Sequence, residues 1–313
     1  MPDLILHHYP MSPFSEKIRA VLGFKQLAWQ SVIIPTVMPK PDLTALTGGY
    51  RKTPVLQIGS DIYCDTALIC EVLEHLQPTP SLYPDGQKGL TRTLAQWADN
   101  TLFWAAMGYN MQKPGMTELF ANVPPEAVKT FGADRSAMAQ GLNRPRPPDA
   151  TSAYKSYLRR LSDMLVDSSF LLGDAPSVAD FAAYHPLWFT RAQVPCMAGI
   201  FQTTPEILAW MDRIAAFGHG QMRKLTAAEA IAVCAGSTGV TGKIDEYFQD
   251  DHGIPLGSHV SLCAESFGSE HTTGELVAAT RTRYTLHRTD PRAGKVQVHF
   301  PRVGYALKLE ATS

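Results

Sequence analysis

Short apolar segments separated by polar turns open the chain. Residues 4–8, LILHH, predict a strand, and a helical pattern begins at Pro13, with Ser12 as its N-cap and Gly23 as its stop. Residues 29–35, WQSVIIP, are rich in β-branched side chains and predict a second strand that ends at a proline. This first segment therefore predicts the order strand, helix, strand.

The next segment predicts a loop, a hairpin and a helix. Residues 36–51 are polar and contain several prolines and glycines, which favours a loop. The runs PVLQIG (54–59) and DIYC (61–64) predict two strands of a hairpin that turns at Gly59-Ser60. Residues 65–76 carry apolar side chains at the spacing of an amphipathic helix. The N-terminal part thus predicts a β-α-β-β-β-α order.

A proline-rich segment, 77–86, interrupts the pattern and predicts a domain boundary. Residues 88–225 predict a mostly helical domain. Within it, Ser177 and Asp180 have the spacing of a capping box, in which each side chain satisfies a backbone N–H at the start of a helix. Residues 203–217 open with threonine and proline and predict another helix.

The pattern changes to period two near the C-terminus. Residues 259–265, 275–288 and 295–310 predict strands. In 275–288, Arg281, Arg283 and His287 share one face, and the other face holds Thr282, Tyr284 and Leu286. Residues 288–294, RTDPRAG, predict a turn between two of them. We therefore expect residues 255–313 to form a small antiparallel sheet appended to the helical part.

Charge and cysteine content narrow the classes of function. The formal net charge of −1 argues against a nucleic-acid partner or an anionic membrane surface, which usually require a basic excess. The five cysteines form no C-x-x-C pair, which favours a reducing compartment, and we expect the cytoplasm. We expect no signal peptide, no membrane-spanning segment and no metal site, since the sequence has no recognisable spacing of metal ligands.

Four segments, in their order along the chain, resemble motifs of the glutathione S-transferase family. They are SPFSEKIR (12–19), RKTPVL (51–56), DTALICEVLE (65–74) and LLGDAPSVADFAAY (171–184). The first resembles the serine-type motif of tau-class plant enzymes and related bacterial ones. The resemblance covers about residues 3–220, and the last ninety or so residues lie outside the usual family pattern.

The resemblance implies a fold and a domain organisation. Residues 1–80 would form an α/β thioredoxin-like, glutathione-binding domain, and residues 88–225 the family's all-α C-terminal domain. Residues 240–313 would follow as an antiparallel β extension of unknown role. The resemblance also implies a homodimer, with glutathione as cosubstrate and a small hydrophobic electrophile as second substrate.

The resemblance makes Ser12 the candidate catalytic residue. A free thiol has a pKa of about 8.5, so glutathione needs help to become a thiolate at neutral pH. The Ser12 hydroxyl would donate a hydrogen bond to that thiolate, with no role as a nucleophile. The simpler interpretation of Ser12 is a helix N-cap, and one hydroxyl can do both. Tyr9 and Ser15 are the alternative donors.

The candidate glutathione-binding residues are Lys40, Lys52, Thr53, Pro54, Asp65 and Thr66, and all of them except Lys40 lie in the segments that resemble the family. The resemblance implies a cis peptide bond before Pro54, which exposes the Thr53 backbone to the tripeptide. Asp65 and Thr66 would hold the γ-glutamyl ammonium and carboxylate at a helix N-terminus. Lys52 and Lys40 would face the glycine carboxylate. The simpler alternatives are an edge-strand proline, a helix cap and solvated lysines.

The sequence leaves the second substrate and the reaction open. Residues 102–111, LFWAAMGYNM, could line an apolar substrate site, although such a stripe is more often core or a dimer contact. The favoured reaction is conjugation of the glutathione thiolate to an electrophile. The alternatives are glutathione-dependent reduction of a peroxide or disulfide, and a binding or scaffold module without turnover.

Overall fold

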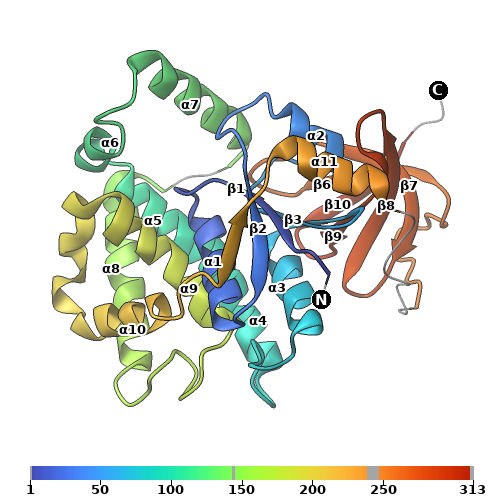
Figure 1. The fold of residues 1–313 in the computed structure, drawn as a ribbon. Helices are drawn as coiled ribbons and strands as arrows, with labels where there is room; N and C mark the ends of the chain where they lie inside the picture. The colour runs from blue at the N-terminus through green and yellow to red at the C-terminus, as the bar shows by residue number, and fades with distance from the viewer. Residues whose placement is uncertain (1, 143–144, 238–246, 311–313) are drawn as a thin grey trace.

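One ten-stranded sheet runs through the part of the chain that the structure, a computed structural model, describes: residues 2–142, 145–237 and 247–310 (Figure 1). Its strands are β1 (Ile5–His8), β2 (Ala28–Ile33), β3 (Val55–Ile58), β4 (Asp61–Cys64), β5 (Gln221–Lys224), β6 (His259–Ala264), β7 (Thr272–Ala279), β8 (Arg283–Asp290), β9 (Gly294–Pro301) and β10 (Tyr305–Leu309). Across the sheet they follow the order β10-β6-β7-β8-β9-β4-β3-β1-β2-β5.

The α-helices are α1 (Pro13–Phe24), α2 (Pro41–Thr47), α3 (Thr66–Leu76), α4 (Lys88–Trp97), α5 (Phe103–Asn110), α6 (Lys113–Leu119), α7 (Pro125–Met138), α8 (Pro147–Met164), α9 (Val178–Trp188), α10 (Pro205–Ala215) and α11 (Ala227–Gly236). Two π-helical turns, Ala98–Leu102 and Phe189–Gln193, and a 3-10 helix, Pro195–Thr203, lie between them. Within the described ranges, none of these helices is both long and apolar enough to span a bilayer.

The N-terminal part has the predicted thioredoxin-like order. Strand β1 pairs in parallel with β2 and antiparallel with β3, and β3 forms the expected hairpin with β4. The prediction of a loop over 36–51 is wrong, because helix α2 lies within it. Pro41 occupies the first turn of α2 and Gly48 follows it with a left-handed φ of 78°, an arrangement typical of short helices.

The sequence predicted that the first helix stops at Gly23, and this prediction is wrong. Helix α1 continues to Phe24, and its C-cap is Lys25, with an ordinary φ of −82°. Gly23 lies instead where another segment crosses the helix. A Cβ on Gly23 would lie 2.0 Å from the carbonyl oxygen of Gly218, so the glycine permits a close approach of two backbones.

The C-terminal strands are antiparallel to one another, as predicted, but they are not appended to the helical part. Strand β9 pairs in parallel with β4, so the extension continues the thioredoxin-like sheet. The predicted strand over 275–288 is two strands, β7 and β8, joined by a turn at 280–282. Residues 240–246 and 311–313 of the predicted extension lie outside the described residues.

The predicted helical domain also contributes a strand. Most of 88–225 is helical, and the capping box of Ser177 and Asp180 at the start of α9 is confirmed. The end of this segment, however, forms β5, which pairs in parallel with β2 at the opposite edge of the sheet. The thioredoxin-like strands are therefore flanked on both sides by strands from the second half of the chain.

The strands of the extension curl, so that its edge strand β10 lies close to β9. Strands β6, β7 and β8 lie between β10 and β9 in the sheet, yet the rings of Tyr305 on β10 and Phe300 on β9 are 5.5 Å apart. Helices α2 and α11 lie beside this curled part, whereas α8, α9 and α10 lie on the other side of the molecule (Figure 1). The curl positions Tyr305 close to the loop before β3, where its ring is 6.4 Å from that of Tyr50.

Candidate functional site

Ser12 lies at the N-terminus of α1, directly after strand β1. Its hydroxyl oxygen accepts a hydrogen bond from the Ser15 backbone N–H at 3.2 Å, so the N-cap role is confirmed. Among the described residues this is the one hydrogen bond of the Ser12 side chain. A hydroxyl has one proton and two acceptor positions, so Ser12 retains a proton that it can donate.

The two alternative donors have different surroundings. Ser15 is fully buried in the first turn of α1, and its hydroxyl has no hydrogen-bond partner among the described residues. The Tyr9 hydroxyl lies 3.3 Å from a guanidinium nitrogen of Arg135, on α7, and accepts its N–H. The Lys40 ammonium lies 5.9 Å from the centre of the Tyr9 ring. Tyr9 is thus already engaged by two cations, whereas Ser12 and Ser15 are not.

The Thr53–Pro54 peptide bond is cis, as the resemblance implies. Lys40 supports the loop before it, because its ammonium donates to the Arg51 carbonyl at 3.2 Å and to the Thr53 hydroxyl at 3.5 Å. Burial, with the neighbouring Arg135 and Arg51, lowers the pKa of Lys40 to about 8. Lys40 is therefore a buried cation beside the cis peptide bond and not a solvated surface lysine.

Asp65 and Thr66 open helix α3. Asp65 caps the helix, since its Oδ1 accepts the Ala67 N–H at 2.9 Å, and its φ of 78° is unusual for a residue other than glycine. The Thr66 hydroxyl accepts a hydrogen bond from the Lys17 ammonium at 3.1 Å. Because Lys17 can only donate, the Thr66 hydroxyl proton points away from Lys17 and is available to an acceptor.

A buried charge network behind Thr66 was not predicted from the sequence. Lys17 Nζ is 2.6 Å from Asp99 Oδ2, and His185 Nε2 is 3.0 Å from Asp99 Oδ1. Burial is the largest single influence and by itself would lower the pKa of Lys17, but the charge and hydrogen bond of Asp99, together with Cys70 and Asp65, outweigh it, so the pKa of Lys17 is raised. These residues come from α1, a π-helical turn and α9, so no local pattern could reveal them.

Lys52 also lies near Asp65. Its ammonium is 5.0 Å from the centre of the Tyr305 ring and 5.6 Å from that of Tyr50. The Tyr305 hydroxyl is in turn 3.1 Å from Asp65 Oδ2. Burial lowers the pKa of Lys52, and the negative charge of Asp65 acts in the opposite direction. The extension therefore contributes an aromatic hydroxyl to the region where the sequence placed only N-terminal residues.

An ion-pair cluster ties the site to the helical part and to the extension. Arg51 donates to Glu270 at 2.9 Å and forms a second ion pair with Asp134 of α7. The side chain of Arg51 is 7% exposed, so both pairs are shielded from water on the arginine side. Three segments that are distant in the sequence thus meet beside the cis-proline loop.

The loop between β6 and β7, residues 265–271, contacts the helical part and, with α7, covers the region beside the cis-proline loop. The backbone N–H of Gly268 donates to the Met138 carbonyl at the end of α7, at 2.9 Å. The Phe267 ring packs edge-on against Trp104, with centroids 5.3 Å apart. Within the apolar stripe 102–111, Ala106 and Met107 belong to the core, whereas Trp104 faces the extension.

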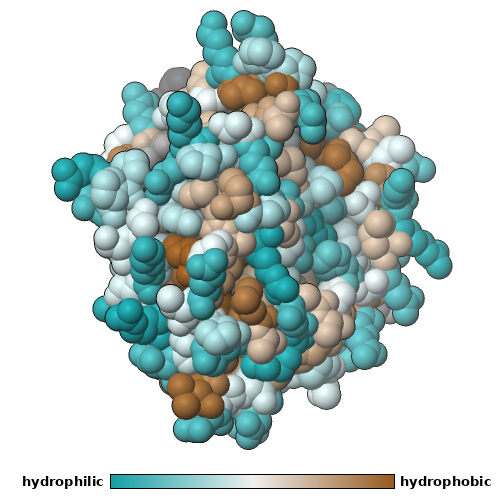
Figure 2. Space-filling view, turned by 90° about the vertical axis from the view of Figure 1, so that its left-hand side faces the viewer, coloured by the Kyte–Doolittle hydropathy of each residue, from teal (hydrophilic) through white to brown (hydrophobic). Residues whose placement is uncertain are grey.

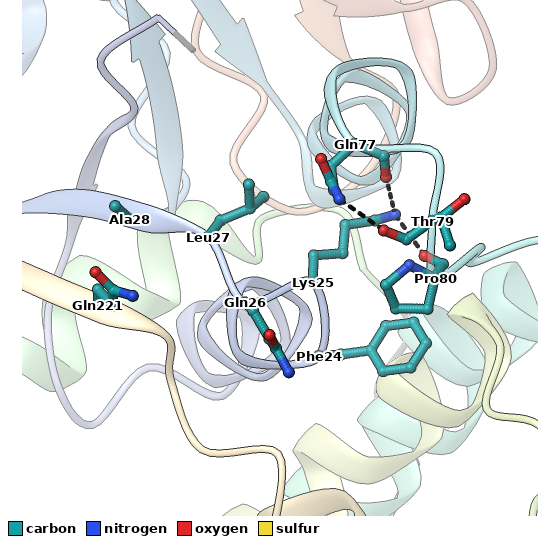
Figure 3. Close-up of a pocket in the computed structure, with 9 residues that line it drawn as sticks. All are labelled: Phe24, Lys25, Gln26, Leu27, Ala28, Gln77, Thr79, Pro80 and Gln221. Atoms are coloured by element: carbon teal, nitrogen blue, oxygen red, sulfur yellow. Dashed lines mark hydrogen bonds between the residues drawn. The ribbon is translucent and has the colours of Figure 1, made fainter.

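A separate pocket lies at the other end of α1 (Figure 3). Its lining is Phe24, Lys25, Gln26, Leu27, Ala28, Gln77, Thr79, Pro80 and Gln221. Lys25 is the charged member of that lining, and its ammonium donates to Glu74 and to the carbonyls of Gln77 and Pro80. All three N–H bonds of the Lys25 ammonium are therefore used within the protein. The described residues also include no cluster of three or more metal-ligating side chains.

Comparison with known proteins finds a matching family model for each of the two parts of the chain. The family model described as "Glutathione S-transferase, N-terminal domain" matches residues 6–81, and that described as "Glutathione S-transferase, C-terminal domain" matches residues 127–213. The curated protein "FtsZ-localized protein A" from Caulobacter vibrioides is 24% identical over 183 residues, which span 57% of this chain and 73% of that protein.

Solved structures show how far the likeness extends. A glutathione transferase from Phanerochaete chrysosporium shares the fold at a TM-score of 0.55 and 18% identity, covering 69% of this chain and 98% of that one. A GST-like protein from Pseudomonas syringae is 41% identical with a TM-score of 0.78, covering 99% of this chain and 100% of that one. The second match includes the C-terminal extension. The chain belongs to the glutathione S-transferase family.

Proposed function

We propose that the chain binds glutathione between the N-termini of α1 and α3 and conjugates its thiolate to a hydrophobic electrophile. Ser12 would donate its hydroxyl proton to the sulfur anion. The Thr53 backbone before cis-Pro54 would pair with the cysteine part of the tripeptide. Lys40 and Lys52 are the candidate partners of the glycine carboxylate.

One observation carries the proposal. The hydroxyls of Ser12 and Thr66, at two neighbouring helix N-termini, are each held as acceptors, and among the described residues neither gives its proton to a partner. Helix N-termini favour anions, so two available donors there suit a thiolate and a carboxylate. Asp65, beside Thr66, supplies the negative charge that an ammonium group needs.

The energies are of the required size. Lowering the thiol pKa by about 2 units needs roughly 2.7 kcal/mol of preferential stabilisation of the thiolate. A hydrogen bond to a charged group contributes about 1.5–3 kcal/mol. The positive end of a helix dipole adds about 0.3–1 kcal/mol. Ser12 and the N-terminus of α1 together can therefore activate the thiol.

Direct binding and turnover measurements test this function. We expect retention on immobilised glutathione and conjugation of at least one member of a panel of aryl halides and enones. Ser12→Ala should raise the pKa of the bound thiol, read from thiolate absorbance, and lower the conjugation rate at neutral pH by at least about tenfold. Ser156→Ala, at an exposed position of α8, is the matched control.

The same measurements separate the alternative donors. If Ser15→Ala or Tyr9→Phe raises the thiol pKa while Ser12→Ala does not, the activating hydroxyl is misassigned. Failure of the unaltered protein to bind glutathione would exclude both conjugation and glutathione-dependent reduction.

A second candidate function is a binding or scaffold module. The observation that favours it is the cover of α7 and loop 265–271, which joins Arg51 to Asp134 and Glu270 beside the cis-proline loop. The likeness to a protein named for its localisation with FtsZ also supports a binding or scaffold function. Glutathione binding without turnover across the electrophile panel would favour this function over the transferase.

A homodimer in the cytoplasm belongs to the same proposal and rests on the family resemblance. On the face that Figure 1 shows at its left, hydrophobic residues form small patches separated by hydrophilic ones (Figure 2). A dimer contact through that face would therefore be of mixed polarity. Light scattering of the purified chain gives the oligomeric state directly.

A further inference from the structure

Tyr305, in the last strand of the extension, contacts the residue that opens α3. Its hydroxyl lies 3.1 Å from Asp65 Oδ2 and 3.3 Å from the Tyr50 hydroxyl. A phenol has a single proton, and a carboxylate is a stronger acceptor than a phenol. Of the two acceptors within reach, the Asp65 carboxylate is therefore the preferred acceptor of the Tyr305 proton.

The surroundings keep Tyr305 in the donating form. Burial, together with the negative charge of Asp65, raises the pKa of Tyr305 well above its usual value, so the hydroxyl stays protonated at neutral pH. The Tyr305 side chain is also held in place, because its ring packs on Phe300 and lies under the Lys52 ammonium. The donor is thus rigid as well as protonated.

Asp65 is consequently fixed at both of its oxygens. Oδ1 accepts the Ala67 N–H and Oδ2 accepts the Tyr305 O–H. A carboxylate offers about four acceptor positions, so about two remain, and Asp65 is only partly buried. Its φ of 78° restricts the backbone as well, so rotation of the carboxylate is the main freedom that Tyr305 removes.

We propose that Tyr305 is a positioning residue, which holds the Asp65 carboxylate in the orientation that receives the ammonium group of the γ-glutamyl end of glutathione. This inference rests on the proposed function of glutathione binding. It assigns a role to the extension: its curl returns the last strand to the start of α3, and the extension completes the binding site of the thioredoxin-like part.

The test compares two ligands and three proteins by calorimetric titration. The ligands are glutathione and glutaryl-cysteinylglycine, which keeps the terminal carboxylate and lacks the ammonium group. The proteins are the unaltered chain, Tyr305→Phe, and the control Tyr284→Phe, whose ring lies in the core of the extension. Both substitutions keep the aromatic ring, and thermal unfolding checks that each variant folds.

We expect Tyr305→Phe to weaken glutathione binding by about 3- to 10-fold, the effect of losing one hydrogen bond that orients a charged group. Its affinity for glutaryl-cysteinylglycine should stay within about twofold of the unaltered chain, since that ligand has no ammonium for Asp65 to bind. Tyr284→Phe should change neither affinity.

Three outcomes would overturn the inference. Unchanged glutathione affinity in Tyr305→Phe would show that Asp65 needs no support. An equal loss for both ligands would show a structural role of Tyr305 that is unrelated to the ammonium group. No glutathione binding by the unaltered chain would reject the proposed function itself, and with it this inference.

Discussion

Lys17 Nζ lies 2.6 Å from Asp99 Oδ2, and this ion pair joins the first helix of the thioredoxin-like part to the helical part. The side chain of Lys17 is 1% exposed and that of Asp99 is 15% exposed. His185 donates its Nε2–H to the second oxygen of Asp99. The relative position of the two parts therefore depends on a charge pair that water scarcely reaches.

Lys17→Met should destabilise the protein by about 3–5 kcal/mol, because it leaves the Asp99 charge buried without its partner. The measurement is the free energy of unfolding in urea. Lys17→Met combined with Asp99→Leu should recover much of the loss, since the double variant has no unpaired charge. If the double variant is less stable than Lys17→Met, the pair is not the cause.

Asp180 is expected to be a second sensitive position. Its carboxylate accepts the backbone N–H of Leu171 and of Ser177 and the indole N–H of Trp210. Asp180→Ala leaves these buried donors unpaired, and we expect a loss of about 3 kcal/mol or more of unfolding free energy. Asp174→Ala, at an exposed position nearby, should change it by less than about 0.5 kcal/mol. Equal effects at the two positions would contradict this prediction.

Acid should destabilise the fold through the histidines of β1. Burial lowers the pKa of His7 to about 4 and, with Arg19, that of His8 to about 3, from 6.5. The unfolded chain binds more protons below pH 6.5, so stability is complete above that pH and is lost as the pH falls towards the folded-state values. Each histidine contributes a slope of at most about 1.4 kcal/mol per pH unit.

Urea unfolding between pH 7.5 and 5 measures this slope. His7→Gln should make the dependence shallower, because one of the proton-binding differences between the folded and unfolded chain disappears. His75→Gln, at an exposed position of α3, is the matched control and should leave the slope unchanged. A free energy of unfolding that stays constant over this pH range would show that His7 and His8 are not buried as neutral groups.

Gly23 is predicted to resist substitution because of a backbone crossing. Gly23→Ala would place a methyl group 2.0 Å from the Gly218 carbonyl oxygen, so α1 and the 217–218 segment would have to separate. We expect a drop of several degrees in the melting temperature, roughly the effect of 1–3 kcal/mol. Gly132→Ala in α7, with no atom near the new methyl group, should be neutral or slightly stabilising.

Local features of the fold were predictable from the sequence, and long-range ones were not. The caps at Ser12 and at Ser177 with Asp180 depend on residues three positions apart, and the structure has both. The attachment of the extension to β4 is set by strand pairing over more than two hundred residues, and period-two alternation does not reveal which edge a strand joins.

The candidate site divides in the same way. The residues that match the family motifs, Ser12, Pro54, Asp65 and Thr66, lie at the starts of α1, β3 and α3. Tyr305, which donates to Asp65, and Glu270, which pairs with Arg51 in the loop before Pro54, come from the extension, which the sequence does not link to those motifs. A lone lysine, glutamate or tyrosine in an amphipathic pattern is indistinguishable from a surface residue until the fold is known.

The placement of β5 and β9 has a consequence for synthesis on the ribosome. Strands β2 and β4 are the outer strands of the N-terminal part. Their outer neighbours, β5 and β9, come from segments that are translated much later. Until then β2 and β4 carry unpaired backbone groups, which invite pairing with other nascent chains. The N-terminal sheet therefore reaches its final strand pairing only after β5 and β9 have been synthesised.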